Sequence, residues 1–427
     1  METRMRLSPE QQSILDGEKG ETLRKVMKTL VMYGETFGAQ RMVPVTGEQG
    51  HLVTSFGLSV MKPVYALMDQ LISDGAVSKQ KFTVDPRPLD ANVPANLLQN
   101  LFFRVMYGKQ ADYEAQLDRL GILGEDAFTC TCYHDEVGNT PKPGDVLSWA
   151  ESSAVVYANS VLGARCNRNS GILELFGSIL GFVPEFGLLT DEGRKASWIV
   201  EVRTADRPEA QLLGSAIGMK VMENVPYIQG LSKHLGTELD DSNRPYLKDM
   251  GAATASNGAV GLYHVDGLTP EAKALGITLV RPDAKVYVVD DAELQRVKEG
   301  YPCIWKDPDA SPKLCFVGCP HLSFWQLNDW TDRLSEALAA AGRKRVAIPT
   351  VFTAAPAVLA RFKDTAAAGR LAAMGVVTSS ICPLMYMNNP LCHKMPVITN
   401  SNKLRTYSTS RYSTDAEILA AISKGGR

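Results

Sequence analysis

The last third of the chain alternates short apolar runs with helical stretches, and this alternation limits the fold more than any other feature of the sequence. We expect buried strands at residues 313–317, 345–348, 375–378 and 396–399. Helical patterns occupy residues 322–341 and 354–374. Strands that alternate with helices form βαβ units around a parallel sheet. The predicted fold class is therefore α/β, with a C-terminal βαβ subdomain at roughly residues 285–427.

Polar or thiol side chains follow three of these four expected strands. They are Cys319 and His321 after the first strand, Cys382 after the third, and Asn400, Ser401 and Lys403 after the fourth. In parallel sheets, ligands bind beyond the carboxyl ends of the strands. We therefore expect these three strand ends to converge on one site.

Helix signals dominate the preceding two thirds of the chain. Ser8, Pro9 and Gln11 have the pattern of a capped helix start, and the helix is expected to continue to about residue 33. Residues 92–120 have a helical pattern. The small residues of 251–261 predict a tight turn.

A second helix start is expected at Ser148 and Glu151, which have the spacing of a capping box. Ser152 and Asn159 are seven residues apart, close to two turns, so they share one stripe of that helix. A stripe of short polar side chains faces either solvent or a site, and the pattern leaves both open.

Charge and cysteine content exclude several classes of protein. The 427 residues carry 45 Lys and Arg against 47 Asp and Glu, a net charge of −2, whereas binding to nucleic-acid phosphates requires a basic surplus. No apolar run has the length of a membrane span, and the N-terminus has no signal-peptide pattern. We expect a cytoplasmic protein whose eight cysteines are thiols.

Two of these thiols, Cys319 and Cys382, precede prolines at expected strand ends, and a third can come from Cys130. Cys132 competes with Cys130, since both point the same way on a strand. Three thiolates suit an iron–sulfur cluster with an open iron, which can act as a Lewis acid on a substrate hydroxyl. The alternative is that the thiols are unrelated core residues, because no CxxC pair is present.

Four segments of the chain resemble one known family. They are Phe128–Tyr133, Trp149–Arg165, Gly318–His321 and Thr399–Lys403. Over nearly its whole length the chain resembles the aconitase X family, a branch of the aconitase superfamily of hydro-lyases. The resemblance implies that residues 1–427 form an aconitase-like catalytic core of layered α/β/α subdomains around an iron–sulfur site.

The resemblance also implies a ligand set and a partner. The cluster cysteines of the family fall on Cys130, Cys319 and Cys382, and the nuclearity (2Fe-2S, 3Fe-4S or 4Fe-4S) stays open. Cys132 stands where relatives often have proline, and Cys166 where they often have threonine, so Cys132 remains an alternative ligand. The swivelling domain of the family is absent from this chain, so we expect a separate small subunit, a heterodimer, and a catalytic base on that partner.

The implied activity is elimination of water from a small hydroxy acid. We expect cis-3-hydroxy-L-proline as the substrate, with mevalonate 5-phosphate as the alternative and a non-catalytic iron–sulfur protein as an alternative of another class. The expected catalytic residues are Ser401, Lys403, Glu151 and Arg165. The expected substrate contacts are His51, Ser152, Ser153, Asn159, Asn400 and His321. Two alternatives are that Arg165 pairs with a nearby carboxylate as scaffolding and that His321 only supports its neighbours.

Overall fold

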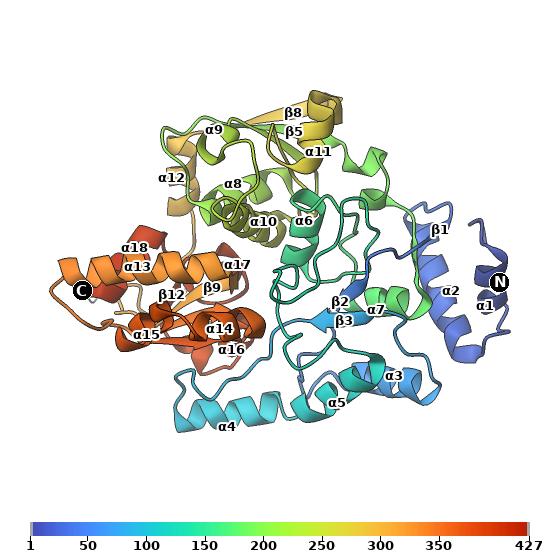
Figure 1. The fold of residues 1–427 in the computed structure, drawn as a ribbon, viewed down its shortest axis with the longest axis horizontal. Coiled ribbons are helices and arrows are strands. Elements are labelled where there is room, and N and C mark those ends of the chain that lie inside the picture. The colour runs from blue at the N-terminus through green and yellow to red at the C-terminus, as the bar shows by residue number, and fades with distance from the viewer. Residues whose placement is uncertain (1–2, 425–427) are drawn as a thin grey trace.

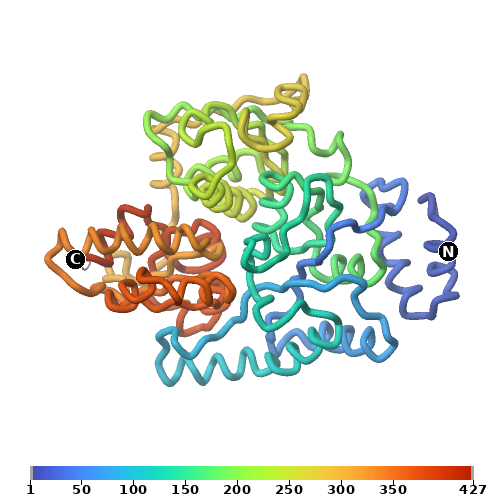
Figure 2. Tube along the Cα trace, viewed as in Figure 1, coloured from blue at the N-terminus to red at the C-terminus, as the bar shows by residue number. Residues whose placement is uncertain are grey.

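The computed structural model describes residues 3–424, which form three lobes that follow one another along the chain (Figure 1). The N-terminal lobe lies at the right of the view, the middle lobe at the top and the C-terminal lobe at the left, and the two chain ends lie on opposite sides (Figure 2). Within the described residues, no helix is both long enough and apolar enough to cross a membrane.

The C-terminal lobe contains the predicted parallel sheet. Its strands, in spatial order, are β11 (Val376–Ser379), β10 (Thr350–Ala354), β9 (Leu314–Leu322), β12 (Val397–Thr399) and β13 (Arg411–Tyr412). Every neighbouring pair is parallel, which confirms the predicted α/β class. The helices of this lobe are α13 (Phe324–Ala340), α14 (Pro356–Lys363), α15 (Ala366–Ala373), α16 (Pro383–Met387), α17 (Asn402–Tyr407) and α18 (Asp415–Lys424).

Two predictions for this lobe were wrong in detail. The apolar run 345–348 is not a strand, because its backbone N–H groups donate to the carbonyls of Met374 at the end of α15 and of Ile422 in α18, and the strand β10 starts after Pro349. The single helix expected at 354–374 is two helices, since Thr365 caps the second by accepting from the Ala368 N–H.

The middle lobe has a second parallel sheet. Its strands, in spatial order, are β7 (His264–Val265), β6 (Pro226–Gln229), β5 (Ala196–Val202) and β8 (Val280–Val289). Its helices are α8 (Ala210–Val221), α9 (Ser232–Leu235), α10 (Arg244–Gly258), α11 (Pro270–Leu275) and α12 (Asp291–Glu299). The boundary expected near residue 285 falls inside β8, and the C-terminal sheet begins at Leu314.

The small residues of 251–261 do not form the predicted turn, because most of them belong to α10. These small residues of α10 allow it to pack closely against α8. A Cβ on Gly218 of α8 would lie 2.7 Å from the carbonyl oxygen of Thr254 on α10, so the two backbones approach too closely for a side chain there.

The N-terminal lobe is mostly helical. Its helices are α1 (Pro9–Leu15), α2 (Glu21–Thr36), α3 (Lys62–Ser73), α4 (Leu97–Met106), α5 (Gln110–Leu120) and α7 (Gly171–Leu180), whereas α6 (Ser152–Ser160) packs on α10 in the core of the middle lobe. Its strand pairs are β1 (Met42–Pro44) with β4 (Phe182–Pro184), antiparallel, and β2 (Gln49–Leu52) with β3 (Lys81–Val84), parallel.

Across the three lobes, short 3₁₀ turns occupy Gly187–Leu189, Glu192–Arg194, Gly276–Leu279 and Cys392–Lys394.

The capping box at Ser8 and Gln11 is confirmed at the start of α1. The expected helices to residue 33 and over 92–120 are each divided in two. The second predicted capping box was wrong. Glu151 itself caps α6 by accepting from the Ala154 N–H, while Ser148 is buried and donates to Glu174.

Candidate functional site

The carboxyl ends of the C-terminal sheet lie at one edge, as parallel strands require. Cys319 and His321 lie on β9, Cys382 follows β11, and Ser401 and Lys403 follow β12. Ser401 caps α17, and its hydroxyl accepts from the Leu404 N–H at 3.1 Å. Lys403 is therefore fixed in the first turn of that helix.

A second, smaller set of parallel backbone pairs supplies the opposite side of the site. Trp149 bridges to His51 on β2, and Phe128 bridges to Val84 on β3, both parallel. The Thr129 N–H donates to the carbonyl of Val84 at 2.7 Å. These pairings bring the residues that follow them to one edge, namely Glu151, Asp85 and Cys130.

The segment that carries Cys319 bulges out of β9. Val317 pairs with Phe352 and Leu322 pairs with Ala354, so the four residues between them oppose a single residue, Thr353. Gly318 has φ of 108°, and a Cβ there would overlap the carbonyl of Thr353. Only glycine suits this position, and the bulge displaces Cys319 from the regular strand.

His321 joins the three segments that carry the predicted thiol ligands. Its backbone N–H points at the Cys130 sulfur at 3.4 Å, and its ring contacts the Thr129 hydroxyl at 3.0 Å and the Ile381 carbonyl at 3.1 Å. Burial lowers the pKa of His321 to about 4, so the ring is neutral. Both ring nitrogens are used in these contacts, which favours a supporting role over substrate contact.

Exposure separates three cysteines from the other five. Cys130, Cys319 and Cys382 are half-buried, and burial raises the pKa of each thiol, that of Cys382 to about 12. The remaining cysteines are either fully buried (Cys132, Cys166, Cys315, Cys392) or exposed (Cys303). Cys132, the alternative to Cys130, packs in the apolar core of the middle lobe.

The donor set of three half-buried thiols fits an iron–sulfur cluster in its chemistry. Among residues 3–424, no group of three His, Cys, Asp or Glu side chains is close enough to hold a single metal ion. A cluster spreads its protein thiolates over different iron atoms, so its ligands stand farther apart than those of one ion. The three-thiol donor set therefore suits a cluster in its chemistry.

Half-buried Lys403 and buried Glu151 form an ion pair between the two sets of strand ends. The other oxygen of Glu151 accepts from the Ser153 hydroxyl at 2.6 Å. Burial alone raises the pKa of Glu151, but the Lys403 ammonium outweighs it and the net pKa is lowered. Burial alone lowers the pKa of Lys403, but Glu151 and two of the half-buried thiols raise it overall.

His51 and Asp85 present unused polar atoms beside this pair. His51 Nε2 and Asp85 Oδ1 are 3.8 Å apart, and neither has a hydrogen-bond partner within residues 3–424. Burial lowers the pKa of His51 to about 4, while burial together with the charge of Glu151 raises the pKa of Asp85 well above its usual value. Such buried, unsatisfied atoms are uncommon unless a ligand completes them.

Arg168 is a further cation near Glu151. Within the described residues, its half-buried guanidinium has neither an ion pair nor a hydrogen bond. Burial lowers its pKa, and the nearby groups Tyr407 and Glu151 oppose that shift. An arginine that keeps all five donors free is suited to holding a ligand carboxylate.

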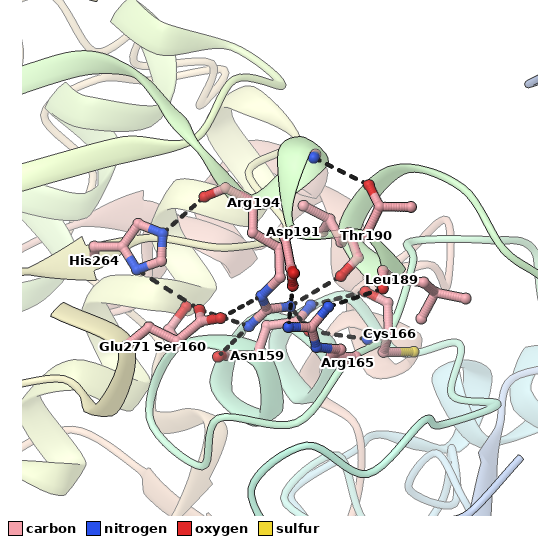
Figure 3. A network of polar contacts seen from close by, with 12 residues as sticks. Asn159, Ser160, Arg165, Cys166, Leu189, Thr190, Asp191, Arg194, His264 and Glu271 are labelled. Carbon is pink, nitrogen blue, oxygen red and sulfur yellow. Dashed lines mark hydrogen bonds and ion pairs between the residues drawn. The ribbon is translucent and has the colours of Figure 1, made fainter. Parts of the chain in front are cut away.

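The structure places three predicted site residues elsewhere. Arg165 donates to the Leu189 carbonyl at 3.0 Å and pairs with Asp191 at 2.5 Å, in the network drawn in Figure 3. Asn159 belongs to the same network, and Asn400 donates to Asp415 at 2.8 Å in a separate polar pocket. Ser152 begins α6 next to Ser153.

Sequence reasoning missed Asp85 and Arg168. A signal for Asp85 was present, since the segment 81–84 is a short β-type run and Asp85 follows its end. The same argument that selected the C-terminal strand ends would have selected it. No sequence pattern distinguishes Arg168 from Arg165, because the difference lies in whether a carboxylate from elsewhere in the chain pairs with the guanidinium.

Two family models match the chain. The model of the aconitase X first domain matches residues 4–192, and that of the aconitase X second domain matches residues 196–299.

Curated proteins and a solved structure are also similar. The phosphomevalonate dehydratase large subunit of Thermococcus kodakarensis is 33% identical over 360 residues, 83% of each chain. The cis-3-hydroxy-L-proline dehydratase of Pseudomonas aeruginosa is 25% identical, covering 94% of this chain and 66% of that protein. The crystal structure of Thermococcus kodakaraensis aconitase X in its holo-form has a TM-score of 0.79 at 27% identity, covering 98% of this chain and 100% of that one. The fold that the resemblance implied is thus confirmed.

Proposed function

Because this chain belongs to the aconitase X family, we propose that it is the large subunit of a two-chain dehydratase that removes water from a small hydroxy acid. The observation that supports this most strongly is the proximity of Lys403 to all three half-buried thiols: burial raises the pKa of each thiol, and the Lys403 charge opposes that rise in all three. Residues 1–427 then act as one catalytic core. A reducing compartment such as the cytoplasm suits its eight free thiols.

Cys130, Cys319 and Cys382 would hold an iron–sulfur cluster. When bound, such a cluster supplies an iron that acts as a Lewis acid on the hydroxyl that leaves. His321 keeps the three thiol-bearing segments in register through its ring and its backbone N–H.

Three polar side chains of the chain have separate roles in binding the substrate and stabilising the reaction. Arg168 holds the substrate carboxylate by charge-assisted hydrogen bonds. Burial raises the pKa of Asp85, which suits this carboxyl to delivering a proton to the departing hydroxide. Lys403 stays charged and stabilises negative charge that develops on the substrate carboxylate.

The pocket lacks an effective base for the proton on carbon among residues 3–424. Glu151 is held as a weak base by Lys403, and the His51 and His321 imidazoles, with pKa values of about 4, bind protons weakly. The base is therefore proposed to come from a small subunit. Five relatives of this chain with 30–33% identity are themselves named large subunits.

The charge balance of the pocket favours cis-3-hydroxy-L-proline as the substrate. Within the described residues Arg168 is a cation near Glu151 without a protein partner, which matches one substrate carboxylate, whereas a phosphate ester brings additional negative charge.

Mevalonate 5-phosphate is the second candidate, since the relatives with 30–33% identity are phosphomevalonate dehydratase subunits. Arg207, which lines a separate polar pocket with Arg333, Gln211 and Asn400, is then the proposed contact for the phosphate.

Two measurements test this proposal. Iron and sulfide are determined in anaerobically purified wild-type protein and in the single variants Cys130→Ser, Cys319→Ser and Cys382→Ser, with Cys132→Ala as the matched control. We expect each of the three serine variants to lose most of its iron and the control to retain it. Retention of iron in all three would contradict the ligand assignment.

Dehydration of both compounds is then assayed with the small subunit added. We expect turnover of cis-3-hydroxy-L-proline and little effect of Arg207→Met. Exclusive turnover of the phosphate ester, with a large rise in KM for Arg207→Met, would establish the second candidate instead. A protein with a full cluster and no turnover of either compound would contradict the dehydratase.

A further inference from the structure

An apolar helix face is exposed next to the proposed site. On α4, the side chains of Leu97, Leu98, Leu101, Phe102 and Val105 are exposed, Leu97 by 87%, Val105 by 66% and Leu101 by 58%; we call these five the α4 apolar face. Figure 1 shows α4 at the outer edge of the molecule, below the C-terminal lobe. A contiguous exposed face of this kind marks an interaction surface more often than it occurs by chance.

The opposite face of α4 is firmly packed. Phe103 is 4% exposed, and its ring packs at a tilt against that of Tyr386 with 5.3 Å between the centroids. The Gln99 carbonyl accepts from Asn389 at 2.9 Å, and Asn96 and Gln99 form a capping box. The helix is therefore held in place by one side, and the exposure of the other side does not result from loose attachment.

A pocket of about 640 Å³ adjoins this face and is lined in part by Leu97, Leu98 and Leu101. Its lining is mostly apolar and includes Leu89, Val93 and Ile381, and Ile381 directly precedes Cys382. The segment that joins β3 to α4 also contacts the Cys382 loop, because the Cys382 N–H donates to the Arg87 carbonyl at 2.9 Å. Figure 2 shows this segment running from the central region to α4 along the C-terminal lobe.

We propose that the α4 apolar face and this pocket are the docking surface for the small subunit, which rests on the two-chain enzyme proposed above. Three observations select this occupant. The surface is apolar like the core of a stable subunit interface. It adjoins the loop of Cys382, a proposed cluster ligand, through Ile381 and the Arg87 carbonyl. The Pseudomonas aeruginosa relative continues well beyond the part that this chain matches, so additional polypeptide accompanies the core in that enzyme.

The test uses the full chain and the small-subunit polypeptide from the same source, identified by its similarity to the unmatched part of the Pseudomonas aeruginosa enzyme. The variant is Leu101→Glu with Val105→Glu, which puts two charges in the middle of the surface. The matched control is Leu275→Glu with Ile277→Glu, at side chains 53% and 59% exposed on the middle lobe. Dissociation constants are measured by calorimetry, and thermal midpoints and iron content confirm that both variants fold.

We expect the α4 variant to bind the small subunit about 100-fold more weakly or worse, and the control to bind within about threefold of wild type. Unchanged binding by a folded α4 variant would overturn the docking surface and leave the dehydratase intact. A variant that loses only self-association, measured by mass photometry, would assign the face to a second copy and also overturn the proposal. Wild-type protein that binds no small subunit would overturn both the docking surface and the two-chain enzyme, whereas α4-dependent binding without dehydration would support the surface and contradict the activity alone.

Discussion

Two polar clusters of this protein contain similar residue types and differ in how many of their polar atoms are hydrogen-bonded within the protein. The cluster around Arg194 uses all five donors of that guanidinium: two go to Glu271 at 2.7 and 2.8 Å, two to oxygens of Asn159 and one to the Leu188 carbonyl (Figure 3). The cluster around Lys403 and Glu151 has neighbours with one polar atom each, His51 Nε2 and Asp85 Oδ1, that find no partner in the part of the chain that the structure describes.

The difference indicates what each cluster is for. A saturated network lowers the free energy of the folded chain and has no capacity left for a ligand. An unsaturated one costs stability in the free protein and gains its partners when substrate binds. Residue type alone does not separate the two, since both contain a cation, a carboxylate and an asparagine or histidine.

The largest expected effect comes from neutralising the unsaturated cluster. In the double variant Lys403→Met with Glu151→Gln, we expect kcat/KM to fall by about 10³–10⁴-fold, about 4–5 kcal/mol of transition-state stabilisation. We expect the free energy of unfolding to stay within about 1 kcal/mol of wild type, because a buried pair is often replaced by neutral groups without cost. Steady-state kinetics of the two-chain enzyme and urea denaturation measure both quantities. Lys273→Met, which removes an exposed ion pair with Glu238, is the control. A double variant with more than a tenth of wild-type activity would remove Lys403 from the catalytic machinery.

Breaking the saturated cluster should do the opposite. Arg194→Met leaves Glu271 and two backbone carbonyls without their donors, and the Arg194 side chain is 1% exposed. We expect a loss of about 3–5 kcal/mol in unfolding free energy. Activity per folded molecule, measured below the unfolding transition, should stay within about threefold of wild type. If activity falls as far as in the Lys403 variant while stability holds, the distinction between the two clusters is wrong.

The buried carboxyl of Glu174 shows how the Lys403 cation affects the pKa of Glu151. Glu174 accepts from Ser148 and Asn169, both at 2.6 Å, and has no basic partner among its hydrogen bonds. Burial raises its pKa to about 8, although these hydrogen bonds oppose the shift. Glu151, with Lys403 beside it, has a lowered pKa.

The sign of the resulting pH dependence follows from the raised pKa. Between pH 5 and 7 the folded chain keeps the Glu174 proton that the unfolded chain releases, so stability falls as pH rises. This group should therefore cost about 2–3 kcal/mol across that interval. Glu174→Gln should remove that part of the slope, as measured by denaturant unfolding at pH 5, 6 and 7. An unchanged slope in the variant would show that Glu174 is ionised in the folded protein.

The sequence predicted the part of the site that long, regular elements deliver. The C-terminal strands have strong apolar runs, and their ends carry Cys319, Cys382 and Lys403, which the structure brings to one edge. The opposite side is built from single-residue bridges at Trp149 and Phe128, which have no periodic pattern to detect.

The positions of the remaining predicted site residues depend on contacts with residues that are distant in the sequence. The resemblance to a family selected the Trp149–Arg165 segment, but spacing along that segment cannot show which side chains face the pocket. Ser153 contacts Glu151, whereas Asn159 turns the other way and holds the backbone of Cys166 at 2.8 Å. Local patterns determine helices and strand ends, and long-range pairing determines which polar residues remain free to bind a ligand.

Arg165 provides the smallest predicted effect and the most direct test of that rule. Its guanidinium is already used by the Leu189 carbonyl and by Asp191, whose side chain is 88% exposed. An exposed ion pair contributes about 0–1 kcal/mol. We therefore expect Arg165→Met to change the unfolding free energy by less than about 1 kcal/mol and kcat/KM by less than about threefold.

Arg168→Met is the matched comparison, because the two arginines are three residues apart and differ in having a protein partner. It should raise KM by about 10–100-fold through loss of the carboxylate contact. If Arg165→Met lowers kcat/KM more than Arg168→Met does, an ion pair within the folded chain does not distinguish structural from substrate-binding arginines. The contact with the substrate carboxylate must then be reassigned from Arg168 to Arg165.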